Sequence, residues 1–338
     1  MADQNVVNNS EPPLVSAVIP TRNRPELVVH AVLSALNQTF RNLEVVVVID
    51  GPDAATEAAL KEIEDARLRV IALPQNVGGS DARNTGVQAA RGQWIAFLDD
   101  DDEWLPNKIE RQLARASASN FHFPVISCQQ FVHTGHAEMI WPREMPSEPI
   151  SEYLFSRKLL SYGDGVLSMI TLLTPRQLMI EVPFRSGLRK HQDTDWVLRA
   201  VRHPGVGIEF VPEPLAVWNV LEGVQTVGRR VDWKFSLEWV RSNRQLLTPR
   251  AYAGFVLTHC AGEAAAQREW RAFPILLIES CRFGSPRLFD FVLYAVAWLA
   301  QIKWLQRIAN IVRGRQPVVL AQGGTPPKPP MEPDRPAH

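Results

Sequence analysis

Residues 94–102 read WIAFLDDDD, in which an apolar run of strand length passes directly into four aspartates. The same change from apolar to polar residues occurs at 15–25 (VSAVIPTRNRP) and at 43–52 (LEVVVVIDGP), and a further apolar run covers 68–73. Short runs rich in valine, isoleucine and leucine, bounded by proline, glycine or aspartate, are typical of buried strands. The sequence therefore predicts four strands, each followed by a turn or loop.

Helical segments alternate with these strands. Apolar residues recur at helical spacing over 25–36, and similar segments follow at 54–66 and 80–91. A crossover helix joins two parallel strands and covers one face of their sheet. The alternation therefore predicts an α/β fold with a mixed, mainly parallel sheet flanked by helices.

The rest of the chain has a weaker pattern. We expect helices at 106–117, 175–180 and 194–202, strands at 124–131 and 163–173, and long helices at 231–247, 251–269 and 288–312. These elements predict four parts: a disordered N-terminus at 1–13, a sheet domain at 14–225, a helical region at 226–314 and a disordered, proline-rich tail at 315–338.

Charge and cysteine content exclude several classes of protein. The 36 lysines and arginines balance 36 aspartates and glutamates, so no global positive field is available to bind nucleic acid. Three widely spaced cysteines, Cys128, Cys260 and Cys281, fit neither a zinc pattern nor a disulfide framework. Because residues 1–13 also lack the features of a secretory signal, we expect a reducing, cytoplasmic location.

Polar residues follow the predicted strands where ligands of open α/β sheets bind, outside the carboxyl ends of the strands. Arg22 and Arg24 follow the first strand, Asp50 the second and the aspartates 99–102 the fourth. Cationic groups beside carboxylates favour a phosphorylated ligand held through Mg²⁺ or Mn²⁺, which prefer oxygen ligands. The chain has neither G-x-x-x-x-G-K-[ST] nor G-x-G-x-x-G, which argues against an ATPase or a dehydrogenase.

Four segments together resemble the family 2 glycosyltransferases, which are inverting nucleotide-diphospho-sugar transferases of the GT-A fold. They are VSAVIPTRNRP at 15–25, the strand ending in Asp50, NVGGSDARNTGVQAARGQWIAFLDDDD at 76–102 and HQDTDWVLRA at 191–200. The similarity covers roughly residues 14–220. It implies that 14–225 is a GT-A catalytic domain and that the protein serves polysaccharide or cell-envelope biosynthesis.

The resemblance also implies which residues bind the nucleotide of the donor. The loop after the first strand would enclose the base and the ribose, and the aspartate that ends the second strand would contact the base. In this sequence these residues are Pro20, Thr21, Arg22, Arg24 and Asp50.

The diphosphate end of the donor would be met by a second group of residues. Arg83 would lie near the nucleotide or its diphosphate. In the Asp-x-Asp (DXD) pattern, Asp99 matches the ribose-side carboxylate and Asp101 the carboxylate that binds Mn²⁺ or Mg²⁺, which bridges to the diphosphate. Asp100 takes the variable position, and Asp102 has a supporting role.

An acceptor hydroxyl becomes a good nucleophile when a positioned base removes its proton. The family usually presents Glu-Asp at the start of a helix, whereas this chain has Gln192-Asp193. Asp193 matches the expected base. A neighbouring glutamate would raise the pKa of Asp193, but Gln192 is neutral and does not, so Asp195 is kept as a second candidate for the base. An aspartate before a helix is also a common N-cap, and Trp196 either lines the acceptor site or belongs to the core.

The C-terminal helices raise the question of membrane contact. Their longest apolar run, 291–300, is much shorter than the roughly 20 residues that span a bilayer. Residues 301–315 mix apolar side chains with basic ones and contain no acidic residue, as in helices that lie in an anionic membrane interface. Two hypotheses stay open for 288–315: peripheral contact with the inner face of a membrane, or packing on the catalytic domain or another subunit.

These features predict a metal-dependent, inverting glycosyltransferase. It would transfer a sugar from a nucleotide-diphosphate donor, for which we expect a UDP-sugar, to a hydroxyl of a glycan or glycolipid acceptor. Two alternatives remain. One is a nucleotide-sugar-binding scaffold with weak or no catalysis, which the glutamine at 192 favours, and the other is transfer to a polyprenyl phosphate, whose oxygen is already ionised and needs no base.

Overall fold

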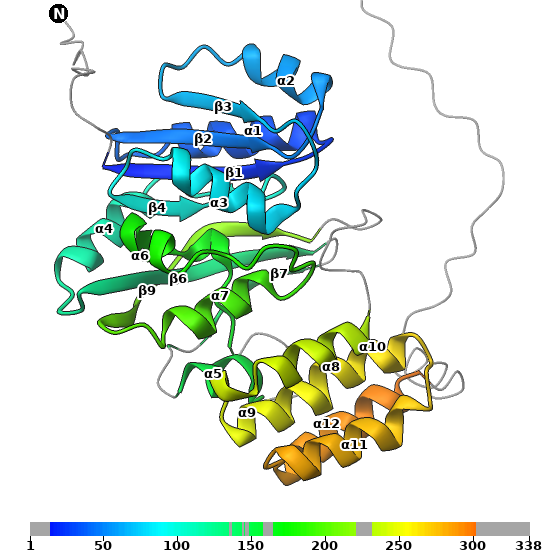
Figure 1. Ribbon diagram of the computed structural model, residues 1–338. Coiled ribbons are helices and arrows are strands. Elements are labelled where there is room, and N and C mark those ends of the chain that lie inside the picture. Colours follow the sequence, from blue (N-terminus) through cyan, green and yellow to red (C-terminus); the bar gives the residue numbers. More distant parts are fainter. Residues whose placement is uncertain are drawn as a thin grey trace, which may run out of the picture. The chain divides into compact units, whose positions relative to one another are not determined.

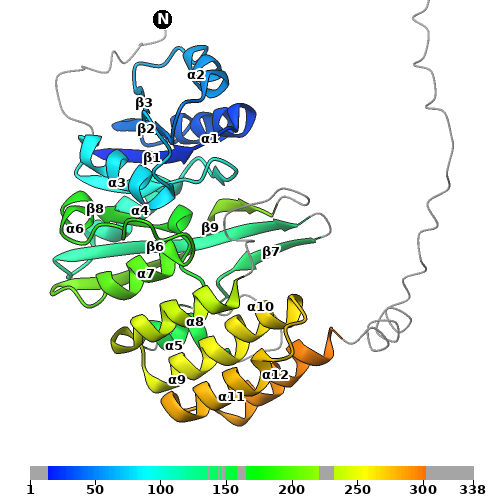
Figure 2. The ribbon, with the colours of Figure 1, turned by 45° about the vertical axis from the view of Figure 1, so that its right-hand side comes forward.

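The computed structural model describes residues 14–134, 137–143, 145, 149–157, 165–220 and 232–301. In these ranges a nine-stranded mixed sheet with helices on both faces is followed by a helical region (Figures 1 and 2). The strand order is β3-β2-β1-β4-β8-β6-β9-β5, with β7 paired to β6. The predicted α/β fold and helical C-terminal region are confirmed, whereas the expected segments 1–13 and 315–338 lie outside the described residues.

The N-terminal half is the parallel part of the sheet. Ala17 and Ile19 of the first strand pack with the first helix, whereas Val18 between them packs on the opposite face, where a Cβ at Gly86 would lie 2.3 Å from its Cγ1. This alternation explains why the strands read as continuous apolar runs. The elements are β1 (Val15–Thr21), α1 (Pro25–Leu36), β2 (Leu43–Ile49), α2 (Ala54–Lys61), β3 (Leu68–Ala72), α3 (Gly79–Ala89) and β4 (Trp94–Phe97).

The second half of the sheet mixes parallel and antiparallel pairs and is less predictable. A 14-residue strand over 206–219 was not expected, because two prolines interrupt it where its pairing with β6 is irregular. The strand expected at 163–173 is wrong over its described part, which is a 3-10 helix at Met169–Thr171 and only then a strand. The elements are β5 (Glu103–Trp104), α4 (Lys108–Ser117), β6 (Phe123–Thr134), β7 (Ala137–Trp141), α5 (Ile150–Phe155), β8 (Leu173–Pro175), α6 (Arg176–Glu181), α7 (Gln192–Ala200) and β9 (Val206–Asn219).

The helical region has its own apolar core, built mainly from aromatic residues and alanines. The helix expected at 251–269 is observed as two α-helices joined by a π-helical stretch at Phe255–Cys260. One helix was missed, because Pro274 lies in its first turn, where a helix tolerates proline. The α-helices are α8 (Trp233–Ser242), α9 (Pro249–Gly254), α10 (Ala261–Ala266), α11 (Ala272–Phe283) and α12 (Leu288–Leu299); residues 302–312 of the last expected helix lie outside the described residues.

Candidate active site

The predicted donor-binding residues lie at one edge of the sheet. Strands β1, β2 and β4 are parallel neighbours, so their carboxyl ends meet at the same side of the molecule (Figure 1). The N-terminal turns of α3 and α7 reach the same place, since the Arg83 side chain of α3 contacts both Asp99 after β4 and Gln192 of α7. The edge therefore brings together four separate segments of sequence.

The loop after β1 binds directly to the aspartate run. The Thr21 hydroxyl donates to Asp100 Oδ2 at 2.8 Å. Arg24 Nη1 donates to Asp100 Oδ1 at 2.8 Å and to Asp101 Oδ2 at 2.9 Å. Two residues predicted to bind the donor thus also hold the residues that follow β4, and Arg24 offsets part of their negative charge.

The same loop has a strained turn that fixes its course. Asn23 has φ 54°, a left-handed conformation that asparagine tolerates better than most residues, and its N–H donates to Asp53 Oδ2 at 2.7 Å. Asp53 is also the N-cap of α2. Pro20 lies half-buried within β1, and Arg22 projects into solvent, so Arg22 is free to meet a ligand.

Asp50 holds the loop between β3 and α3. Its carboxylate accepts hydrogen bonds from Asn76 Nδ2 at 2.6 Å and from the N–H groups of Val77 and Gly78 at 2.7 and 3.0 Å. Gly78 needs its φ of 90° to turn the chain into α3. Asp50 therefore shapes the wall of the site, and its contact with a base stays a prediction.

Arg83 is the central cation of the site. Its guanidinium is buried, donates to Asp99 Oδ1 through Nη2 and to Gln192 Oε1 through Nη1 at 2.8 Å, and lies 5.8 Å from the centre of the Phe184 ring. Charge-assisted hydrogen bonds of this kind are about twice as strong as neutral ones. Arg83 thereby fixes the end of β4 against the start of α7.

The aspartate run carries more negative charge than its surroundings neutralise. Burial, reinforced by the charges of Asp99 and Asp100, raises the pKa of Asp101 to about 6, against the opposing effect of Arg24. Burial also raises the pKa of Asp100, and that of Asp102 lies well above its usual range for the same reason. Such crowded carboxylates bind an added cation favourably.

A divalent cation at Asp101 fits this arrangement if the ligand completes its coordination. In the described part of the chain, no group of three or more His, Cys, Asp or Glu residues is arranged to hold a metal. Mg²⁺ commonly uses one or two carboxylates and takes its other ligands from water and substrate phosphates. Asp101 would supply such a carboxylate once Arg24, which now donates to its Oδ2, gives way.

Asp193 lies in the first turn of α7. The N-cap is His191, with φ 64°, so the hypothesis that Asp193 caps the helix is wrong. Asp193 Oδ2 accepts the Met169 N–H at 3.2 Å. Burial raises the pKa of Asp193, Arg83 opposes this rise and Asp99 adds to it. A carboxylate with a raised pKa is a better proton acceptor than an ordinary one, which suits Asp193 to proton transfer.

Asp195, the second candidate base, has a different environment. It is 1% exposed and accepts hydrogen bonds from Arg185 Nη1 at 3.0 Å, Arg199 Nε at 2.8 Å and Trp239 Nε1 at 3.1 Å. Trp239 belongs to α8, so Asp195 joins α7 to the helical region. These partners give Asp195 a structural role, and the structure does not support it as the base.

Trp196 belongs to the core. Its side chain is fully buried, its Nε1 donates to the Val182 carbonyl at 2.8 Å, and its ring packs 6.2 Å from that of Phe184. A ring without an exposed face cannot stack on a sugar. Of the two hypotheses for Trp196, the core residue is confirmed and the acceptor-binding one is wrong.

Four hydrogen bonds of the site could not be found in the motifs. They are Gln192 to Arg83, the Met169 N–H to Asp193, and two from Asn219, whose N–H donates to Asp102 Oδ1 at 2.9 Å and whose side chain donates to the Asp101 carbonyl at 3.0 Å. Met169 lies in a 3-10 helix where a strand was expected, and Asn219 ends the unexpected strand β9. Their roles depend on pairing between distant segments, for which no local signal exists.

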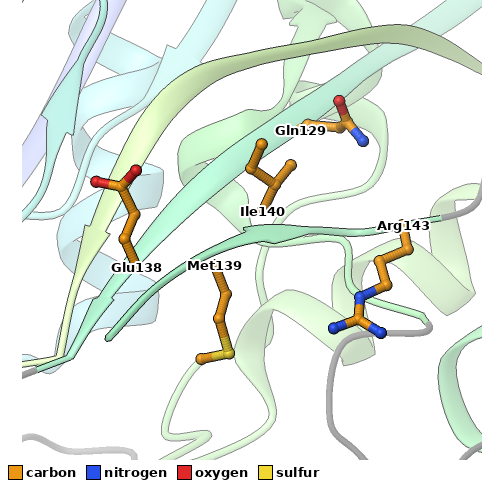
Figure 3. Close-up of a pocket in the computed structure, with 5 residues that line it drawn as sticks. All are labelled: Gln129, Glu138, Met139, Ile140 and Arg143. Carbon is orange, nitrogen blue, oxygen red and sulfur yellow. The ribbon is translucent and has the colours of Figure 1, made fainter. Parts of the chain in front are cut away.

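A pocket of about 500 Å³ lies along the β6–β7 hairpin (Figure 3). Val132 of β6 is paired with Met139 of β7 on one side and with Trp218 of β9 on the other. Adjacent strands are about 4.8 Å apart, so Met139 lies two strand spacings from Trp218, which precedes Asn219 in β9. The pocket is lined by Gln129, Glu138, Met139, Ile140 and Arg143.

A solved structure shows the fold class. The crystal structure of S. aureus TarS 1-349 in complex with UDP-GlcNAc matches this chain with a TM-score of 0.51 at 19% sequence identity, covering 89% of this chain and 83% of TarS 1-349. Together with the mixed sheet and its ligand-binding edge, this similarity defines a protein of the GT-A glycosyltransferase fold.

Sequence comparisons identify the family. The model of glycosyl transferase family 2 matches residues 16–170. The putative colanic acid biosynthesis glycosyl transferase WcaA of Escherichia coli (strain K12) is 30% identical over 215 residues, which are 63% of this chain and 71% of WcaA. This chain belongs to glycosyl transferase family 2, and it is a glycosyltransferase.

A second relative has a more specific description. The UDP-Glc:alpha-D-GlcNAc-diphosphoundecaprenol beta-1,3-glucosyltransferase WfgD of Escherichia coli is 34% identical over 167 residues, covering 48% of this chain and 62% of WfgD. Across four curated relatives, the chain spans between 32% and 79% of the length of the relative.

Proposed function

We propose that this protein transfers a sugar from a UDP-sugar, with a divalent cation, to a hydroxyl of a glycan or glycolipid, with inversion at the anomeric carbon. The observation that carries the proposal is the placement of Asp193. Its carboxylate has a raised pKa and lies beside the Arg83–Asp99 pair at the edge where ligands of open α/β sheets bind.

The residues of the site have separable roles in this proposal. Thr21, Arg22 and Arg24 bind the nucleotide, and Arg83 orients Asp99 toward the ribose. Asp193 removes the proton of the acceptor hydroxyl, so that the oxygen attacks the anomeric carbon opposite the leaving diphosphate. A cation at Asp101, Mn²⁺ or Mg²⁺, would supply charge stabilisation of the departing diphosphate.

The name of WfgD supports the choice of donor, since it describes a UDP-glucose-dependent enzyme. Donor choice is testable by thermal unfolding, because a ligand that binds only the folded state raises its apparent stability. We expect UDP with Mn²⁺ to raise the Tm more than GDP, dTDP or CDP with Mn²⁺. A larger shift with another diphosphate would overturn the choice of UDP, and no shift with any of them would favour a degenerate site.

The decisive experiment for the reaction is Asp193→Asn, assayed by the release of UDP from UDP-glucose and by the binding of UDP. Loss of a general base typically costs a factor of 10²–10⁴ in rate. We expect such a loss with UDP affinity unchanged. Full turnover in Asp193→Asn would favour an acceptor that needs no base, such as a polyprenyl phosphate. UDP binding without any turnover in the unmodified protein would favour a scaffold.

The hairpin pocket is our proposed place for the acceptor. Its lining includes Ile140 and Met139, which project to opposite sides of β7, and the polar groups of Gln129, Glu138 and Arg143, a mixture that suits a sugar ring (Figure 3). Arg143→Ala should weaken the use of a glycan acceptor while leaving UDP binding unchanged. An unchanged KM for an acceptor that the enzyme uses would contradict this placement.

We also propose that the protein contacts the inner face of an anionic membrane through α11 and α12. These helices lie on the side of the helical region away from the sheet (Figures 1 and 2). Their exposed apolar residues include Ile278, which is 63% exposed, and Leu288, which is 83% exposed. Their two acidic residues, Glu279 and Asp290, are buried. The one exposed charge of α11 is then that of Arg282, which complements anionic lipid.

Vesicle flotation tests this contact. No helix within the described residues has both the length and the apolar character that crossing a bilayer requires, so the contact would be interfacial. The protein should float with phosphatidylglycerol vesicles at low salt, and Ile278→Asp should abolish this. Val70→Asp is the matched control, because Val70 is an exposed apolar residue on β3. Equal loss in both variants, or no flotation at all, would contradict the proposal.

A further inference from the structure

The segment before Asp193 is held by a buried chain of hydrogen bonds from the helical region. His191 Nε2 lies 2.9 Å from Ser236 Oγ, and Ser236 Oγ donates to Glu263 Oε2 at 2.8 Å. Because the serine directs its one proton to Glu263, His191 Nε2 is the donor to Ser236. Lys190 Nζ binds the other carboxylate oxygen of Glu263. Residues 190 and 191 are thus both linked to one carboxylate of α10.

Aromatic rings enclose the His191 side chain. Its ring centre lies 4.7 Å from that of Trp239, 5.4 Å from that of Phe255 and 5.0 Å from that of His259. Burial, assisted by His259 and Lys190, lowers the pKa of His191 to about 3. The imidazole is therefore neutral, and its Nε2 carries the proton that it donates to Ser236.

The enclosure of the His191 side chain matters because the backbone of His191 has an unusual conformation at the start of α7. A non-glycine residue at φ 64° is uncommon and persists where its surroundings hold it. The His191 carbonyl accepts the Asp195 N–H at 2.8 Å and so begins α7. The conformation of His191 consequently sets the direction of the first helical turn, in which Gln192 and Asp193 lie.

We propose that Ser236 and Glu263 are positioning residues for the transfer reaction, through which the helical region holds His191 and thereby directs the Asp193 carboxylate. The inference rests on the proposed role of Asp193 as the base. A displacement of about 1 Å in a catalytic group can cost a factor of about 100 in rate. Ser236 and Glu263 would therefore affect the rate without contacting the donor.

The test compares two variants that break the His191–Ser236–Glu263 hydrogen bonds with a matched control. Ser236→Ala and Glu263→Gln each remove one of the two partners in the helical region. The control, Glu279→Gln, removes another buried carboxylate of the helical region, which binds Arg241 and Tyr252. Glu263 is 9% exposed and Glu279 6% exposed, so both substitutions should lower the Tm. Turnover is measured as UDP released from UDP-glucose with Mn²⁺, and UDP affinity is measured separately.

We expect kcat to fall by about 10- to 100-fold in Ser236→Ala and Glu263→Gln, with KM for UDP-glucose and affinity for UDP unchanged. Glu279→Gln should keep the kcat of the unmodified protein. Unchanged kcat in Ser236→Ala, or the same loss in Glu279→Gln, would overturn the inference even if Glu263→Gln fails to fold. Full turnover in Asp193→Asn would instead overturn the proposed function.

Discussion

Gln192→Glu is the most informative single substitution in the site. It replaces the amide beside Asp193 with a carboxylate of the same shape, and so restores the Glu-Asp pair usual in the family. The Arg83 bond to the 192 side chain, 2.8 Å long, would become an ion pair, and the bond from Gln192 Nε2 to the Leu188 carbonyl would be lost. The main consequence is a second negative charge next to Asp193.

The size of the effect follows from Coulomb's law. Two unit charges roughly 8 Å apart interact by about 2 kcal/mol at an effective dielectric constant of 20, which corresponds to about 1.5 pKa units. Arg83 would neutralise part of the new charge. We therefore expect the pKa of Asp193, already raised by burial against the effect of Arg83, to rise by about one further unit.

The assay is the pH dependence of kcat for UDP release from UDP-glucose. A base with a higher pKa stays protonated, and hence inactive, up to a higher pH. The acidic limb of the profile should therefore move upward by about one pH unit. Gln177→Glu is the control, because it adds the same charge at an exposed position of α6.

An acidic limb of the kcat profile that stays in place or moves to lower pH in Gln192→Glu would refute this prediction. Either result would mean that the group controlling the limb does not lie beside residue 192. The same upward movement in Gln177→Glu would show that the shift reflects net charge and not the environment of Asp193.

Three further predictions concern other parts of the chain. Asp101→Asn should remove the additional Tm shift that Mn²⁺ gives with UDP, because it removes the proposed metal ligand; an unchanged Mn²⁺ effect would contradict that assignment. Asp195→Asn should lower the free energy of unfolding by about 1.5–3 kcal/mol, measured by urea denaturation, because it removes the charge that accepts hydrogen bonds from Arg185 and Arg199, while UDP affinity stays unchanged. Gly86→Ala should cost about 1–3 kcal/mol by the same measurement, since its Cβ would lie 2.3 Å from Val18 Cγ1, and a neutral result would show that α3 can move away from β1.

The parallel half of the fold could be read from local sequence. Strands β1 and β2 are buried on both faces, so burial itself produces the continuous apolar runs from which they were predicted. The α1 helix has an apolar face and a proline at its first position, two signals that act within the helix. Such features depend on neighbours in the sequence, which explains why α1 was predicted with its observed bounds, 25–36. The helix expected at 54–66 was predicted too long, because α2 ends at Lys61.

The mixed half of the sheet and the helical region could not be read in the same way. Strand β9 contains Pro212 and Pro214, which argue against a strand unless the sheet provides an irregular pairing for them, as β6 does here. Helix α11 has Pro274 in its first turn, and its packing on the neighbouring helices stabilises it. In both cases tertiary contacts overrule a local signal.

The sequence by itself determined the α/β fold, its family and the identity of the carboxylates and arginines that line the ligand edge, because spacing within a strand–loop–helix unit is a local property. Only the tertiary structure decided which partners and which degree of burial each of these residues has. In the folded protein Trp196 is buried in the core, and Asp195 accepts a hydrogen bond from Arg199. Asp193 lies beside Arg83. These outcomes depend on burial and on charges from distant segments, whose free energies exist only after the chain has folded.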